Sequence, residues 1–260
     1  MSICLAATWY PRGELSRFIH LLPLLEQAYA WIVVSYIPSP DPGILEQLMA
    51  SGSTPSHLSI FINDDQHSGR YLALQKALDR PVGFIHYADL DRLLHWVETR
   101  PGEWKGSLEQ IERFDGIIFG RMHAAYSTHP QALIATENIS NQVVSFALGE
   151  TMDVSAGSKS FSRSAAQYLV DHCQSGNSIA SDAEWPIILR QAGYELQYVE
   201  VDGLDWESAD QYRERVASKT EQAQAAEVYD ANPKHWARRV EIAEQIIHTA
   251  LKLVKENRRV

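Results

Sequence analysis

Several features that mark particular classes of protein are scarce in this sequence of 260 residues. It holds only two cysteines, Cys4 and Cys173, and their spacing matches neither a disulfide framework nor a zinc site. The N-terminus lacks the basic stretch and apolar core of a secretory signal, and no segment approaches the roughly 20 uninterrupted apolar residues that span a bilayer. We therefore expect a cytoplasmic protein without a transmembrane segment.

Positive charge is also in short supply. The chain carries 23 basic and 33 acidic side chains, a net charge of −10, which opposes attraction to a phosphate backbone or an anionic membrane. We expect no nucleic-acid partner. Neither a phosphate loop ending in Lys-Ser/Thr nor a zinc-like histidine spacing is present, and nothing singles out a Ser/His/Asp triad.

What the chain does have is an ordinary globular composition, 45% hydrophobic and 22% charged, with no internal repeat and no low-complexity linker. Short apolar runs alternate with helical apolar spacing, which predicts an α/β fold with a three-layer, mainly parallel sheet. The predicted strands are 2–8, 31–37, 58–62, 82–87 running into Asp89, 116–119 and 194–201. The predicted helices are 14–29, 44–50, 71–78, 93–98, 130–148, 164–173 and 182–191.

The last part of the chain, 206–260, differs in composition and is rich in Glu, Gln, Ala, Lys and Arg. Apolar residues at helical spacing over 237–255 predict an amphipathic helix. This extension can pack on the domain formed by 1–205, form the seam of a homodimer, or close over an acceptor substrate. Packing on the domain is the interpretation we favour.

Two carboxylates directly follow the fourth predicted strand. Ligands of parallel α/β sheets bind beyond the carboxyl ends of the strands, and Asp89 and Asp91 lie there. Both side chains can reach one cation, and their hard oxygens suit Mg²⁺ or Mn²⁺, which would in turn bridge a diphosphate. The alternative is structural: Asp89 caps the following helix and Asp91 favours its first turn.

The surroundings of this pair resemble a known family. Gly69-Arg-Tyr-Leu-Ala-Leu74 followed by Gly83-Phe-Ile-His-Tyr-Ala-Asp-Leu-Asp91 is similar to the helix and strand that lead into the Asp-x-Asp motif of nucleotide-sugar glycosyltransferases with the A-type fold. The stretch 153–163 resembles the acceptor-side segment of glycosyltransferase family two, and 182–186 its following acidic segment. The resemblance covers about 2–205 and departs from the family where the loop 8–12 lacks an acidic residue and where no membrane anchor follows.

The resemblance implies a nucleotide-diphosphate-sugar transferase fold of mixed sheet type and a role for particular residues. Asp89 and Asp91 would hold the metal and diphosphate, with Asp91 favoured as the direct ligand, and Asp182 or Glu184 would be the catalytic base near the acceptor. An N-cap is the alternative for Asp182. The remaining donor-binding candidates are Thr8, Arg70 and Gly157, with Ser155 beside the glycine; Lys159 and Arg163 add positive charge, Arg121 follows a strand, and Trp9, Tyr10, Trp96 and Trp185 lie near the expected rim.

The function that these residues favour is a glycosyltransferase, dependent on Mn²⁺ or Mg²⁺, that moves a sugar from a nucleotide-diphosphate sugar to a hydroxyl acceptor. One alternative is a non-catalytic protein on the same fold that binds a nucleotide sugar or a partner. Another is a sugar-1-phosphate nucleotidyltransferase, which residues 8–13 disfavour because they supply no glycine-rich loop. Donor base, sugar and acceptor are left open.

Overall fold

A mixed seven-stranded sheet forms the centre of the computed structural model, which describes residues 2–38, 43–50, 57–63, 68–173 and 177–257. The strand order is β3-β2-β1-β4-β6-β5-β7. All neighbouring strands are parallel except where β6 pairs with β4 and β5. The strands are β1 Ile3–Trp9, β2 Trp31–Tyr36, β3 Leu58–Ile62, β4 Phe84–Asp89, β5 Gly116–Arg121, β6 Ser158–Ser162 and β7 Leu196–Val201. The predicted fold class is confirmed.

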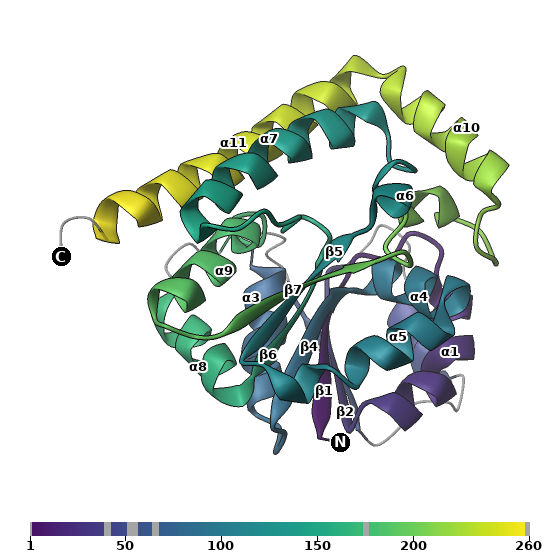
Figure 1. The fold of residues 1–260 in the computed structure, drawn as a ribbon. Helices are drawn as coiled ribbons and strands as arrows, with labels where there is room; N and C mark the ends of the chain where they lie inside the picture. Colours follow the sequence, from purple (N-terminus) through teal and green to yellow (C-terminus); the bar gives the residue numbers. More distant parts are fainter. Residues whose placement is uncertain (1, 39–42, 51–56, 64–67, 174–176, 258–260) are drawn as a thin grey trace.

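Helices cover both faces of this sheet, as Figure 1 shows. The helices are α1 Leu15–Ala28, α2 Ile44–Ala50, α3 Gly69–Leu78, α4 Leu90–Thr99, α5 Pro101–Leu108, α6 His123–Tyr126, α7 Gln131–Leu148, α8 Arg163–His172, α9 Ser181–Gln191, α10 Lys219–Asp230 and α11 Pro233–Asn257, with short 3₁₀ turns η1 Ile111–Arg113 and η2 Glu207–Asp210. Helices α5 and α6 were not predicted from the sequence.

The alternation of β1 explains the two cores. Leu5 and Ala7 point to the face covered by α1, α2, α4 and α5, whereas Cys4 and Ala6 point to the face covered by α3, α8 and α9. Each of these four β1 residues is fully buried, as expected for a central parallel strand with helices on both sides. Trp96 of α4 and Trp185 of α9 lie fully buried, one in each of these cores. Our placement of these two tryptophans at the rim was therefore wrong.

Strand β6 was not predicted from the sequence. Its sequence Ser-Lys-Ser-Phe-Ser is short and polar, yet Ser158 to Ser160 are almost completely buried between β4 and β5. Because β6 is antiparallel, its first residue lies at the carboxyl ends of β4 and β5 and its last at their amino ends. The turn before β6 thus reaches the strand edge at which Asp89 lies.

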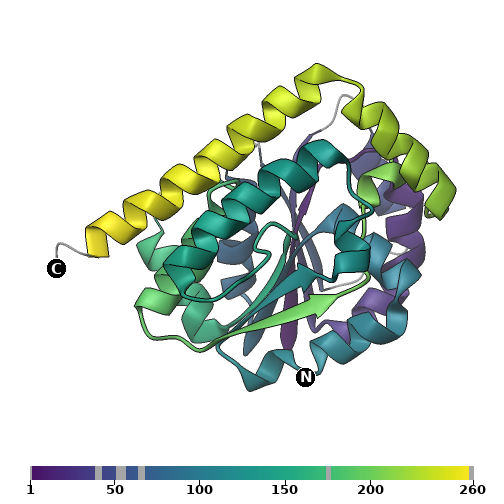
Figure 2. The same cartoon turned by 45° about the horizontal axis from the view of Figure 1, so that its top comes forward.

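The C-terminal extension packs on the domain. Helix α11 runs along α7 and α9, where Ile246 and Ala250 join an apolar cluster with Val144. Helix α10 ends at Asp230, whose carboxylate accepts hydrogen bonds from the first backbone N–H groups of α7, those of Gln131 and Ala132, at 2.7 and 2.9 Å. Figure 2 shows α10 joined to the first turn of α11 and lying beside the carboxyl ends of the strands. No helix in the described part of the chain has the length and apolar character needed to cross a membrane.

Candidate functional site

Asp89 ends β4 at the centre of the sheet, and hydrogen bonds fix both of its carboxylate oxygens. It occupies the N-cap position of α4, but its side chain does not cap that helix. One oxygen, Oδ1, accepts hydrogen bonds from the Thr8 hydroxyl at 3.0 Å and from the Tyr87 hydroxyl, and Oδ2 accepts one from Arg70 at 2.9 Å. The alternative interpretation, in which the Asp89 side chain caps α4, is therefore wrong.

The charge of Asp89 is stabilised by its surroundings. Burial alone would raise the pKa of this carboxyl, but the guanidinium groups of Arg70 and Arg92 and the hydroxyls of Tyr87 and Thr8 outweigh burial and lower the pKa to about 2. Asp89 is thus an anion at every physiological pH. The same contacts place Thr8 and Arg70, two of the predicted donor-binding residues, directly on the predicted metal ligand.

Gly157 lies against Asp89 and is required there for two reasons. Its φ of +71° falls in the left-handed region that disfavours side chains, and an added Cβ would lie 2.6 Å from Asp89 Oδ2. Its carbonyl oxygen accepts the backbone N–H of Asp89 at 3.0 Å. The left-handed φ of Gly157 fits the predicted tight turn, and the group that Gly157 offers to Asp89 is a carbonyl acceptor. Backbone donors near a bound sugar stay a prediction.

Asp91 lies in the first turn of α4 and is bonded to the guanidinium of Arg12, which comes from the loop after β1. The next residue, Arg92, lies between two further carboxylates: its Nε is 3.5 Å from Glu207 Oε1 and 3.9 Å from Asp89 Oδ2. Burial, opposed by Arg92 and reinforced by the negative charge of Asp91, raises the pKa of Glu207. Two arginines are therefore interleaved with three carboxylates at this edge of the sheet.

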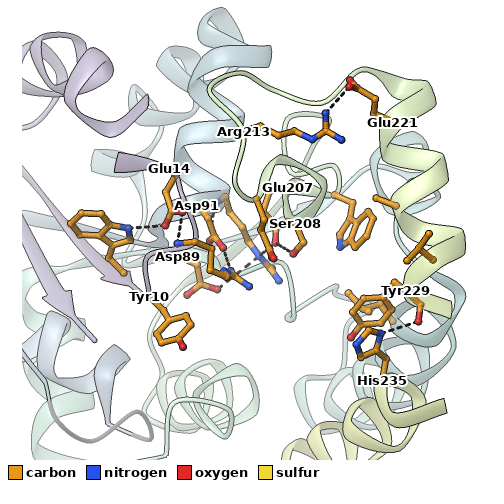
Figure 3. A pocket seen from close by; sticks show the side chains of 18 of the residues that line it. Tyr10, Glu14, Asp89, Asp91, Glu207, Ser208, Arg213, Glu221, Tyr229 and His235 are labelled. Atoms are coloured by element: carbon orange, nitrogen blue, oxygen red, sulfur yellow. Dashed lines mark hydrogen bonds and ion pairs between the residues drawn. The ribbon is translucent and has the colours of Figure 1, made fainter. Parts of the chain in front are cut away.

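These residues line a pocket of about 820 Å³ between the strand ends and the C-terminal helices. One side, here called the strand-end wall, comprises Thr8, Tyr10, Arg12, Asp89, Asp91 and Arg92. The opposite side, here called the helical wall, comprises Leu133, Ala225, Val228, Tyr229, His235 and Arg239 from α7, α10 and α11. Figure 3 shows the two walls facing each other, with the segment of Glu207 and Ser208 between them. The volume of the pocket is near the upper end of the range of about 300–1,000 Å³ for ligand pockets.

The helical wall is mainly aromatic and aliphatic. The His235 ring stacks on Tyr229 with 4.0 Å between ring centroids, and Tyr229 meets Trp206 edge to face. Arg239 is bonded to Glu137 of α7. The wall thus offers apolar surface to a ligand, whereas the strand-end wall offers charges.

The two predicted catalytic acids lie behind the pocket. Asp182 Oδ1 accepts hydrogen bonds from Arg70 and from Lys159, both at 2.8 Å, and its side chain is 9% exposed. Glu184 is bonded to the Tyr71 hydroxyl. Neither acid is among the residues that line the pocket, although Arg70 links Asp182 directly to Asp89. Their catalytic role stays a prediction.

The cations predicted to offset a leaving diphosphate have other partners. Lys159 is buried, and burial lowers the pKa of its ammonium, which lies against Asp182. Arg163 follows the antiparallel strand β6 and lies at the opposite edge of the sheet, where it donates to the carbonyls of Leu78 and Arg80. The prediction for Arg163 was wrong because β6 was not recognised as an antiparallel strand. Arg121 is buried in an ion network with Asp153 and Glu137.

Some pocket residues were overlooked in the sequence. Arg12 and Arg92 could have been found, because each follows a strand at its carboxyl end within a few residues, as does Asp91. Glu207, Tyr229 and His235 carry no comparable signal. They come from the extension, whose position over the strand ends depends on helix packing and is not encoded in any local motif.

No family model matches the chain, and no curated protein matches it. Among solved structures, it is similar to a candidate nucleotide-diphospho-sugar transferase from Desulfovibrio desulfuricans G20, with 16% identity, a TM-score of 0.44, and coverage of 92% of this chain and 99% of that one. At this level of similarity the function of the present chain has to be argued from its own residues.

Proposed function

We propose that this chain is a glycosyltransferase that binds a nucleotide-diphosphate sugar at the strand-end wall and transfers the sugar to a hydroxyl acceptor. One observation carries the proposal: Asp89 at the end of the central strand β4 and Asp91 just beyond it line, together with Arg12 and Arg92, a pocket large enough for a nucleotide sugar. The guanidinium groups supply positive charge for a diphosphate, and preset charge of this kind stabilises a leaving group as its negative charge develops.

A divalent cation, Mn²⁺ or Mg²⁺, is part of the proposal, with Asp91 as its ligand. The Asp91 side chain is 24% exposed in the pocket, and among the described residues its Oδ1 accepts a hydrogen bond only from the adjacent backbone N–H of Arg92. Asp89 fits less well, since both of its oxygens accept hydrogen bonds from side chains. Among the residues that the structure describes, no group of three or more His, Cys, Asp or Glu side chains could hold a metal ion. Asp91 would hold such a cation through one carboxylate oxygen, and the diphosphate and water would supply its remaining ligands. When bound, such a cation would supply positive charge to the diphosphate.

The test is a calorimetric titration of the intact protein with UDP, GDP and their sugars, with and without Mn²⁺. The wild type is compared with Asp91→Asn and with Asp79→Asn, a carboxylate that lies outside the pocket at the end of α3 and has a 60% exposed side chain. We expect metal-dependent binding of one nucleotide family, lost by about tenfold or more in Asp91→Asn and unchanged in Asp79→Asn. Equal binding by all three proteins, or none in folded wild type, would refute the proposal.

A non-catalytic binding protein is the second candidate, and a specific observation favours it. Both predicted metal ligands are already ion-paired, Asp89 with Arg70 and Asp91 with Arg12. A site that binds a nucleotide sugar through arginines alone would show full affinity without Mn²⁺ and would leave the bound sugar intact over a long incubation. Chromatography that detects free nucleotide released from the bound donor distinguishes the two candidate functions.

A further inference from the structure

The pocket contains a basic group that differs from all its carboxylates. Among the described residues that line it, the acids are paired with cations or donors: Asp89 with Arg70, Asp91 with Arg12, Glu207 with Arg92, Glu221 with Arg213, and Glu14 with Trp9 Nε1 and the Arg12 N–H. These partners occupy carboxylate oxygens that would otherwise be open to the proton of a substrate hydroxyl. The remaining proton acceptor of the described lining is His235.

The hydrogen bonds of His235 define which of its nitrogens can act. His235 Nδ1 lies 2.9 Å from the carbonyl oxygen of Tyr229. A carbonyl oxygen only accepts, so Nδ1 carries the hydrogen, and in the neutral ring Nε2 then keeps a lone pair. Among the described residues, Nε2 has no hydrogen-bond or ion-pair partner, while stacking on Tyr229 at 4.0 Å fixes the plane of the ring.

The location of His235 suits an acceptor. It lies in the first turn of α11, on the helical wall, and faces the strand-end wall across the pocket in Figure 3. Leu133, Ala225, Val228 and Tyr229 surround this part of the lining with apolar and aromatic surface. A hydroxyl compound with a flat or apolar face, such as a sugar ring or an aryl glycoside, can therefore lie between His235 and a donor held at Asp91.

From these contacts we infer that the helical wall is the acceptor subsite and that His235 Nε2 is the general base of transfer. This inference rests on the proposed function. The acceptor hydroxyl gives its proton to Nε2 while its oxygen forms a bond to the anomeric carbon. The bond from that carbon to the diphosphate oxygen breaks, and its electron pair leaves with the nucleoside diphosphate. Attack from the side opposite the leaving group inverts the anomeric configuration.

The first experiment is independent of turnover. Nitrogen-15 NMR of the protein labelled at histidine, with His235→Ala to assign the signal, reports which ring nitrogen carries the hydrogen. We expect the Nδ1–H form for neutral His235 and a change at Nε2 on addition of p-nitrophenyl β-D-glucopyranoside. An Nε2–H form, or no response to this probe in a protein with its donor bound, would overturn the inference.

The second experiment separates His235 from the sequence-predicted base. Single-turnover rates with UDP-glucose or GDP-mannose, whichever binds, and the same aryl glycoside are compared in wild type, His235→Ala, Asp182→Asn and His248→Ala. His248 lies exposed on the same helix and outside the pocket lining. We expect about a 100-fold or greater fall in the rate for His235→Ala, with donor affinity within about twofold of wild type, and no change for His248→Ala.

Each outcome has one meaning. A fall confined to Asp182→Asn assigns the base to Asp182 and overturns the role of His235. A wild-type protein that binds its donor without any turnover also overturns it, while the donor site of the proposed function stands. Failure to bind any donor refutes the proposed function itself.

Discussion

The two walls of the pocket are built in different ways. On the strand-end wall the carboxylates are held by side chains of other elements: Asp91 by Arg12, and Asp89 by Thr8 of β1, Arg70 of α3 and Tyr87 of β4. The helical wall has few such bonds and depends on how α10 and α11 pack. A network of fixed charges suits a ligand of constant chemistry, such as a diphosphate, whereas a wall of packed helices can differ in shape without disturbing those charges. The two walls should therefore respond to different perturbations.

The largest effect is expected from a change that disrupts the strand-end wall at its most crowded point. Gly157→Ala combines a left-handed φ with a Cβ placed 2.6 Å from Asp89 Oδ2, and should lower the free energy of unfolding by about 3 kcal/mol. Gly149 is the matched control, since its φ is +74° but no atom lies within 4 Å of an added Cβ. Gly149→Ala should cost about 1–2 kcal/mol. Urea unfolding measures both, and equal losses would show that contact with Asp89 contributes nothing.

A second prediction concerns His95, which joins α4 to the segment between the walls. Its ring bonds Asp205 at 2.8 Å and Asp210 at 2.6 Å. Burial would lower the pKa of His95, but these bonds outweigh it and raise the pKa to about 9, against 6.5 for a free histidine. The stabilisation is complete below about pH 6.5 and is lost as pH rises through 9, because the folded protein then also gives up the proton.

The measurement is the difference in free energy of unfolding between wild type and His95→Gln at pH 6 and pH 10. The difference in unfolding free energy between the two proteins should be smaller at pH 10 than at pH 6 by on the order of 2 kcal/mol. His129→Gln is the control, since burial and the neighbouring Arg121 and Arg92 lower the pKa of His129 and keep it neutral at both values. If the free-energy difference between wild type and His95→Gln does not change with pH, the ion pairs of His95 with Asp205 and Asp210 do not contribute to stability.

A third prediction tests whether Arg12 competes with the proposed cation for Asp91. Arg12→Gln removes the guanidinium bonded to Asp91 and should strengthen Mn²⁺ binding in the absence of nucleotide by about five- to tenfold. The same change should weaken nucleotide binding in the presence of Mn²⁺ by about tenfold, since one phosphate partner is lost. Electron paramagnetic resonance of Mn²⁺ and calorimetry measure the two affinities. Arg213→Gln, at the rim of the pocket and paired with Glu221, is the control. Effects of the same sign on both ligands would exclude competition at Asp91.

Sequence reasoning succeeded where local rules determine position. The strand that ends at Asp89 and its parallel neighbour β1 both follow from apolar runs and from the place of ligands in α/β sheets. It failed at β6, because Ser158, Lys159 and Ser160 are polar yet buried, and tertiary pairing with two strands outweighs their weak strand signal. It also failed for His235, since amphipathic spacing predicts a helix and not the surface on which that helix packs.

The smallest expected effect separates the helical wall from the strand-end wall. Asp230 ends α10 and accepts hydrogen bonds from two backbone N–H groups at the start of α7, so Asp230→Ala should cost about 1 kcal/mol of unfolding free energy. Hydrogen exchange should become faster in α10 and in the first turn of α7, while the amides of β4 and of Gly157 keep their protection. Glu227→Ala, an exposed residue of the same helix, is the control and should change neither. Faster exchange around Asp89 in Asp230→Ala would mean that the two walls are coupled, because a loss of helix anchoring alone cannot reach the fixed charges of the strand-end wall.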